Sequence, residues 1–74
     1  MLNNESCRIL RMREVQLKIG VARSTLYDWS DPRSPRFDKT FPKPIKLGGN
    51  SVGWINGEIE DWICRRAASR KHIY

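Results

Sequence analysis

Residues 12–29, MREVQLKIGVARSTLYDW, carry the clearest structural pattern of this chain. Met12, Val15 and Ile19 recur at the spacing of one helix face, and most side chains between them are polar. Gly20 follows directly and can adopt the left-handed conformation that ends a helix in a sharp turn. The pattern therefore predicts a short amphipathic helix that is closed by a glycine.

A second helix of about two turns is predicted to run from Ala22 to Trp29. At about 100° per residue, Thr25, Leu26 and Trp29 share the side that should face the core. The opposite side is polar, and it consists of Arg23, Ser24, Tyr27 and Asp28. Two short amphipathic helices joined by a tight glycine turn are typical of a helix-turn-helix, in which the second helix enters the major groove of DNA.

The polar side of this second helix carries groups that suit nucleic acid. Arg23 can pair bidentately with guanine O6 and N7, and Asp28 can accept a hydrogen bond from cytosine N4. Hydroxyl groups suited to phosphate or base contacts are present on Ser24 and Tyr27 of this side, and also on Thr25 of the core-facing side. The alternative is purely structural, with Tyr27 partly buried and Arg23 a solvated residue at the start of the helix.

A short β-hairpin is predicted after residue 44. Residues 45–47 and 52–54 have alternating apolar side chains and are separated by Gly-Gly-Asn-Ser at 48–51. A two-stranded hairpin is marginal alone, so its apolar side chains are expected to pack onto the helices. These side chains are Ile45, Leu47, Val52 and Trp54. The groups expected to approach DNA phosphates as a wing are Lys46, Gly49, Asn50 and Ser51. An ordinary turn that closes a small sheet is the alternative.

All four prolines of the chain lie in segment 30–44, which is therefore predicted to be a loop. Phe37 and Phe41 could attach this loop to the body of the domain. Cations of the loop would add mostly sequence-independent affinity for phosphates. The candidates are Lys43, Arg33 and Arg36. Loop cations are often simply solvated, and that alternative stays open.

The ends of the chain frame one domain, predicted at residues 10–67. Residues 1–9 are largely polar and aperiodic, and we expect them to form a flexible N-terminal arm. Asn56 is expected to be the N-cap of a third helix that has an apolar stripe. Residues 68–74 would then form a basic C-terminal tail.

Composition narrows the classes of function. The chain has 74 residues, enough for a single small domain, and its net charge of +6 favours a polyanionic partner such as DNA. No segment has the apolar length of a membrane span or of a secretory signal, so we expect a cytoplasmic protein without a membrane partner. Cys7 and Cys64 are too far apart for a metal-binding knuckle, and titratable groups do not cluster as in a catalytic site. We therefore expect no enzymatic activity, no metal, no cofactor and no small-molecule substrate.

The chain contains separated segments in an order shared with a known family, at residues 10–15, 20–27, 41–48, 52–54 and 58–63. Over about residues 9–66 it resembles the AlpA family of phage and prophage regulators. The resemblance implies a winged helix-turn-helix of the kind found in the MerR DNA-binding head and in phage excisionases, mainly α with a small β-hairpin wing. It also implies that Arg23, Ser24, Thr25 and Tyr27 belong to the recognition helix, and residues 46–52 to the wing.

The resemblance further implies a transcriptional regulator of integrase genes or an excision factor of a mobile element, without enzymatic activity. We therefore expect sequence-specific binding to double-stranded DNA at the nucleoid. The sequence shows no coiled-coil segment of three or more heptads, so copies lying side by side and a weak dimer are both open. The alternative is a protein-interaction module or inhibitor that uses the same fold on an acidic protein surface, with Leu17 as a contact. Ala22 stands where the family usually has a capping serine, which would cost about 1 kcal/mol of helix stability.

Overall fold

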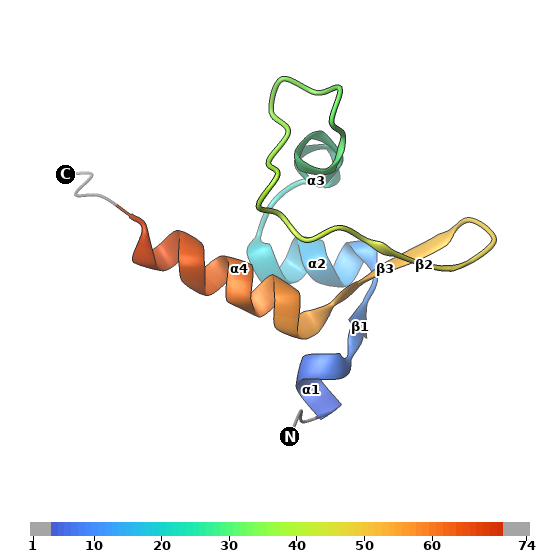
Figure 1. Cartoon of the computed structure of the whole chain (residues 1–74). Helices are drawn as coiled ribbons and strands as arrows, with labels where there is room; N and C mark the ends of the chain where they lie inside the picture. Colours follow the sequence, from blue (N-terminus) through green and yellow to red (C-terminus); the bar gives the residue numbers. More distant parts are fainter. Residues whose placement is uncertain (1–3, 71–74) are drawn as a thin grey trace.

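The computed structural model of the protein describes residues 4–70, in which helices pack around a small antiparallel sheet (Figure 1). In chain order the elements are α1 (Asn4–Cys7), β1 (Ile9–Leu10), α2 (Met12–Ile19), α3 (Arg23–Ser30), β2 (Ile45–Gly48), β3 (Ser51–Ile55) and α4 (Asn56–Ala68). The hairpin of β2 and β3 extends away from the helices (Figure 1). The predicted fold class, one mainly helical domain with a small β-hairpin, is confirmed, and the arrangement is compatible with a winged helix-turn-helix.

The helix pair predicted around Gly20 is present as α2 and α3. Gly20 has a φ of 84°, and its N–H donates to the carbonyl oxygen of Gln16 at 2.7 Å. A side chain would be strained at this φ, so glycine permits the sharp turn between the helices. α3 begins at Arg23, after Ala22, whose extended backbone is that of an N-cap but whose side chain accepts no hydrogen bond. The missing cap expected at Ala22 is therefore confirmed.

The core lies between the helix pair, β3 and α4. Its buried side chains are Leu10, Val15, Leu26, Phe41, Trp54, Ile59 and Trp62. Trp29, Phe41 and Trp62 form an aromatic cluster in which ring centroids are 5.1 to 5.5 Å apart. Phe41 belongs to the proline-rich loop, so this cluster attaches the loop to the body of the domain. Phe37, by contrast, is 39% exposed.

The sheet has the strand order β1-β3-β2, and both strand pairs are antiparallel. Leu10 lies opposite Trp54, and both side chains are buried against the helices. Lys46 lies opposite Val52, which shares the face of Trp54 because side chains alternate along a strand. One face of the sheet therefore begins in the core at Trp54 and continues outward along the hairpin to Lys46.

The opposite face of the sheet is apolar and exposed. Ile45 is 40% exposed and Leu47 is 45% exposed, so the expectation that both pack onto the helices is wrong. The physical reason is alternation: the helices cover the face that carries Val52 and Trp54, and Ile45 and Leu47 point to the other side. A side chain added at Gly53 would meet Cδ1 of Leu47 at 3.2 Å, which places Leu47 on this second face.

The N-terminal segment differs from its sequence-based description as a flexible arm. Residues 4–7 form α1, which packs against α4, and Ile9 pairs with Ile55 across the sheet. Asn56 makes this possible, because its side-chain amide donates to the carbonyl oxygen of Glu5 at 2.8 Å. The helix α4 begins at Asn56, so the expectation that Asn56 is its N-cap is wrong. Ile55 holds the N-cap position. Residues 1–3 of the expected arm and residues 71–74 of the expected tail lie outside the described residues.

Candidate nucleic-acid interface

An open groove lies between α3 and the hairpin, with the start of α2 at its floor. Figure 1 shows α3, seen end-on, above α2, and the hairpin reaching to the right beyond α2. The side chains that line the groove are Arg11, Met12, Arg13, Gln16, Arg23, Tyr27, Asn50 and Val52. The second helix and the tip of the hairpin therefore contribute to one concave surface, which carries three arginines.

Arg23 and Tyr27 form the α3 side of this groove. Nη2 of Arg23 donates to Oη of Tyr27 at 3.0 Å, and the guanidinium carbon lies 5.4 Å from the centroid of the Tyr27 ring. Tyr27 is 52% exposed, so it is a surface side chain and not a partly buried one. The pair holds a cation and a phenol together at the surface, one helical turn apart.

The hairpin is attached to the helix pair by Arg11, which is not among the site residues predicted from the sequence. Nε of Arg11 donates to the carbonyl oxygen of Val52 at 3.0 Å, and the backbone N–H of Arg11 donates to Glu14 at 3.0 Å. Glu14 also forms an ion pair with Arg8. This short network fixes the start of α2 against β3. The sequence shows that Arg11 and Arg13 are cations at the start of a helix. No local pattern indicates that Arg11 bonds to Val52.

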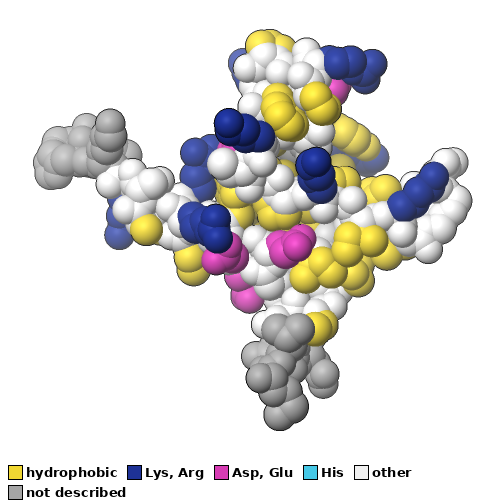
Figure 2. All heavy atoms as spheres, in the orientation of Figure 1, with side chains coloured by type: hydrophobic (Ala, Val, Ile, Leu, Met, Phe, Trp, Pro, Cys, Tyr) yellow, Lys and Arg dark blue, Asp and Glu magenta, His cyan; other side chains and the backbone are white. Residues whose placement is uncertain are grey.

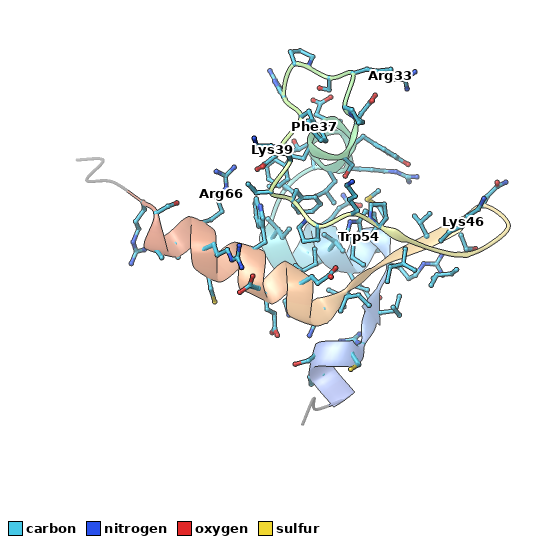
Figure 3. All side chains as sticks on the ribbon, in the orientation of Figure 1. Arg33, Phe37, Lys39, Lys46, Trp54 and Arg66 are labelled. Atoms are coloured by element: carbon cyan, nitrogen blue, oxygen red, sulfur yellow. The ribbon has the colours of Figure 1, made fainter. Side chains whose placement is uncertain are left out.

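The far end of the groove is the hairpin tip. Gly48 has a φ of 143° and Gly49 a φ of 52°, which side chains rarely adopt, so glycine permits the tight reversal before Asn50. The tip residues are exposed, and their backbone is open to an approaching phosphate. Lys46 is also exposed and, by its register with Val52, lies on the groove side of the sheet. Figure 3 shows Lys46 on the hairpin, well apart from Arg33 on the loop after α3.

Three other polar residues of α3 differ in their surroundings. Ser24 is exposed and Thr25 is partly buried. Asp28 accepts a hydrogen bond from Oγ of Ser34 at 3.3 Å and lies 3.8 Å from Nη1 of Arg36. Asp28 and Arg36, both proposed from the sequence as DNA contacts, are thus paired with each other on the loop side of α3.

The remaining candidate cations lie outside the groove. Lys43 borders a separate basin beside α4, together with Glu58 and Asp61. Arg33 forms an ion pair with Asp31 at 3.2 Å. A hydrogen bond from the backbone N–H of Arg33, and a second from its side chain, hold the pKa of Asp31 below its ordinary value. These positions can add to a positive surface, and Figure 2 shows Lys and Arg side chains over the hairpin, the loop and α4.

The loop is held against α4 by Asp38. Its carboxylate accepts hydrogen bonds from the Thr40 hydroxyl at 2.6 Å and from the Thr40 backbone N–H at 2.9 Å, and it lies 3.1 Å from Nη2 of Arg66. Burial raises the pKa of Asp38, but the hydrogen bonds from Thr40, the charge of Arg66 and the N–H of Phe41 outweigh it. The pKa of Asp38 therefore lies below its ordinary value.

Residues 8–67 match the model of a family described as prophage CP4-57 regulatory protein (AlpA). The chain belongs to the AlpA family. Because the family is one of regulatory proteins and matches most of the chain, the expectation that the protein is not an enzyme is confirmed.

Two relatives of this AlpA-family chain are informative. It is 53% identical over 66 residues to a protein of Escherichia coli K12 named DNA-binding transcriptional activator AlpA, covering 89% of this chain and 94% of that protein. It is 36% identical over 67 residues to the uncharacterized protein ORF88 of Enterobacteria phage P4, covering 90% of this chain and 69% of the phage protein. No solved structure matches the chain at a significant level. Within residues 4–70, none of the helices combines the length and the apolar character that a membrane crossing requires.

Proposed function

We propose that this AlpA-family protein is a sequence-specific, double-stranded DNA-binding transcriptional regulator of a prophage or another mobile element. In this proposal α3 enters the major groove and the hairpin follows the adjacent backbone as a wing. The observation that carries the proposal is the shared groove, in which Arg23 and Tyr27 of α3 face the same space as Asn50 of the hairpin tip. The name of the Escherichia coli relative, a DNA-binding transcriptional activator, supports it.

Base recognition is assigned to the exposed side of α3. Arg23 would read guanine O6 and N7, because a guanidinium can make both hydrogen bonds at once. Tyr27 orients Arg23 and adds a hydroxyl, while Ser24 and Thr25 have hydroxyls near the start of the helix for phosphate or base contacts. Asp28 would reach a base only after its contacts with Ser34 and Arg36 rearrange.

Phosphate contacts are assigned to the groove arginines and the wing. Arg11 and Arg13 line the floor of the groove, and Lys46 lies on the groove side of β2. Gly49, Asn50 and Ser51 would bring backbone N–H groups close to a phosphate. Each neutralised phosphate releases counterions, so the affinity should fall steeply as salt rises. Lys43, Arg33 and Arg36 would add a weaker, less specific part of the positive field.

The protein would act in the cytoplasm, on the nucleoid, and would control integrase expression or assist excision of the element. Copies would bind side by side or as a weak dimer, because one small module usually has modest specificity. A protein-interaction module on an acidic partner is the competing possibility, and the same experiment distinguishes the two.

The test is a salt titration of binding to a duplex and to its single strands. The duplex is selected by the protein from a random-sequence pool, and binding is followed by fluorescence anisotropy from low to physiological salt. We expect duplex preference, and we expect Lys46→Ala to weaken every duplex alike and lower the salt slope by about 1. Lys39→Ala, an exposed loop change outside the groove, is the matched control. Equal binding to single strands, or failure to select any duplex, would overturn the proposal.

A further inference from the structure

The sheet carries an exposed apolar surface that DNA binding leaves free. We call it the outer sheet face, and it consists of Ile9, Ile45, Leu47 and Ile55 around Gly53. Ile45 and Leu47 are 40% and 45% exposed, and Ile9 and Ile55 are partly buried. A side chain at Gly53 would collide with Cγ2 of Ile9, so the Ile9 side chain packs over the glycine. Figure 2 shows hydrophobic atoms gathered at the base of the hairpin.

The outer sheet face lies on the opposite side of the hairpin from the proposed DNA groove. Val52 lines the groove, and Lys46 shares its side of the sheet. Ile45 and Leu47 alternate with Lys46 and therefore point the other way. A duplex seated in the groove would leave the outer sheet face uncovered. Two aliphatic side chains exposed side by side on so small a domain suggest a contact with another protein surface.

The charges beside the outer sheet face indicate what that surface is. Ile45 also borders the basin next to α4, whose rim carries Lys43 and Glu58. Within residues 4–70, neither Lys43 nor Glu58 forms an ion pair, whereas Asp61 and Arg65 in the same basin pair with each other at 2.9 Å. An apolar surface flanked by one unpaired cation and one unpaired anion is complementary to a copy of itself. A partner of a single charge sign would satisfy only one of the two.

We propose that two copies of this protein contact each other through the outer sheet face when they occupy neighbouring DNA sites. This inference rests on the proposed function. Identical surfaces meet about a two-fold axis, which lets Lys43 of each copy approach Glu58 of the other. The contact uses the face of β2, on which Ile45 and Leu47 are exposed. The surface is small, so copies should associate only weakly in solution and contribute on DNA, where the effective concentration is high.

The proposed two-fold contact can be tested by changing the relative orientation of two DNA sites. Binding is measured on duplexes that carry one selected site, two sites as an inverted repeat, or two sites as a direct repeat. The spacing is varied in single base pairs over one helical turn, about 10.5 base pairs. A two-fold contact satisfies only the inverted repeat, so we expect about tenfold tighter binding of the second copy there, at one preferred spacing. The direct repeat should bind two copies independently.

Substitutions in the outer sheet face test whether the contact between copies lies there. Ile45→Thr and Leu47→Thr keep β-branched or strand-compatible side chains, so the hairpin should form and single-site affinity should stay within about twofold. Both should lose the tenfold cooperativity on the inverted repeat. Leu17→Gln, which removes a 72% exposed leucine on α2, is the matched control and should keep it.

Each other outcome contradicts the inference. Wild-type protein without cooperativity on inverted repeats, or cooperativity confined to direct repeats, would overturn it while leaving DNA binding intact. Cooperativity that survives Leu47→Thr would place the contact elsewhere. Loss of transcriptional stimulation by Leu47→Thr with unchanged cooperativity would assign the outer sheet face to another protein. Absence of single-site binding would overturn the proposed function itself, and the inference with it.

Discussion

The guanidinium of Arg23 lies over the ring of Tyr27, 5.4 Å from its centroid, and donates a hydrogen bond to its hydroxyl at 3.0 Å. The two residues are one helical turn apart, so the helix itself holds them at this spacing. An arginine already held in place loses less rotamer freedom when it binds, which raises its affinity for a site it fits. Arg23 is therefore the side chain on which base preference is expected to depend most.

Arg23→Ala should weaken binding to the selected duplex by about 1 to 3 kcal/mol and relax preference at one base pair. Tyr27→Phe keeps the ring but removes the hydroxyl, so it should cost less, about 1 kcal/mol. Anisotropy titrations on the selected duplex and on duplexes with single base changes measure both effects. Lys39→Ala, an exposed loop change outside the groove, is again the matched control. Equal losses on every sequence would make Arg23 a phosphate contact instead of a base reader.

Arg11→Met should loosen the hairpin from the helix pair, because it keeps an unbranched apolar stem but removes the Nε–H that donates to the carbonyl of Val52. We expect a loss of about 1 kcal/mol in unfolding free energy and faster hydrogen exchange of amides in β2 and β3. Arg13→Met removes a charge from the same groove and should leave hairpin exchange unchanged. Equal hairpin protection in the two variants would contradict the role given to Arg11.

Ala22→Ser should stabilise the protein, because Ala22 has the extended backbone of an N-cap and no side-chain oxygen for the free N–H groups of α3. The expected gain is about 1 kcal/mol, seen as a Tm several degrees higher in thermal unfolding. Ala67→Ser introduces the same side chain inside the last turns of α4, where serine disfavours the helix slightly, and should lower the Tm. A lower Tm for Ala22→Ser as well would show that the start of α3 cannot use a cap.

Asp38→Asn should remove a pH-dependent part of the stability. The pKa of Asp38 is lower in the folded protein than its ordinary value, so the carboxylate stabilises the fold above about pH 4, and this contribution is lost as pH falls through the lower folded pKa. Urea unfolding of wild type and variant between pH 7 and pH 2.5 measures the difference. It should be constant at neutral pH and shrink in acid. Asp61→Asn, an exposed change on α4, should alter stability little at any pH. A difference between wild type and Asp38→Asn that does not change with pH would contradict this account.

Local features of the molecule were predictable because their causes are local. The turn at Gly20 follows from one residue with a positive φ, and the two helices follow from the spacing of Val15, Ile19 and Leu26. The hairpin follows from alternation on both sides of Gly49. Exposure of Arg23 and Tyr27 on one side of α3 follows from helical periodicity alone.

Contacts between distant parts of the chain were not predictable in the same way. A helix-turn-helix followed by a hairpin could be derived from the residues alone, because periodicity and backbone preference act over a few residues. It took the folded chain to show that Asn56 fixes α1, that Arg11 joins the hairpin to α2, and that Ile45 and Leu47 face outward. Each of these depends on which face of one element meets another far away in the chain. Alternation reveals that a strand has two faces, and packing decides which of them is covered.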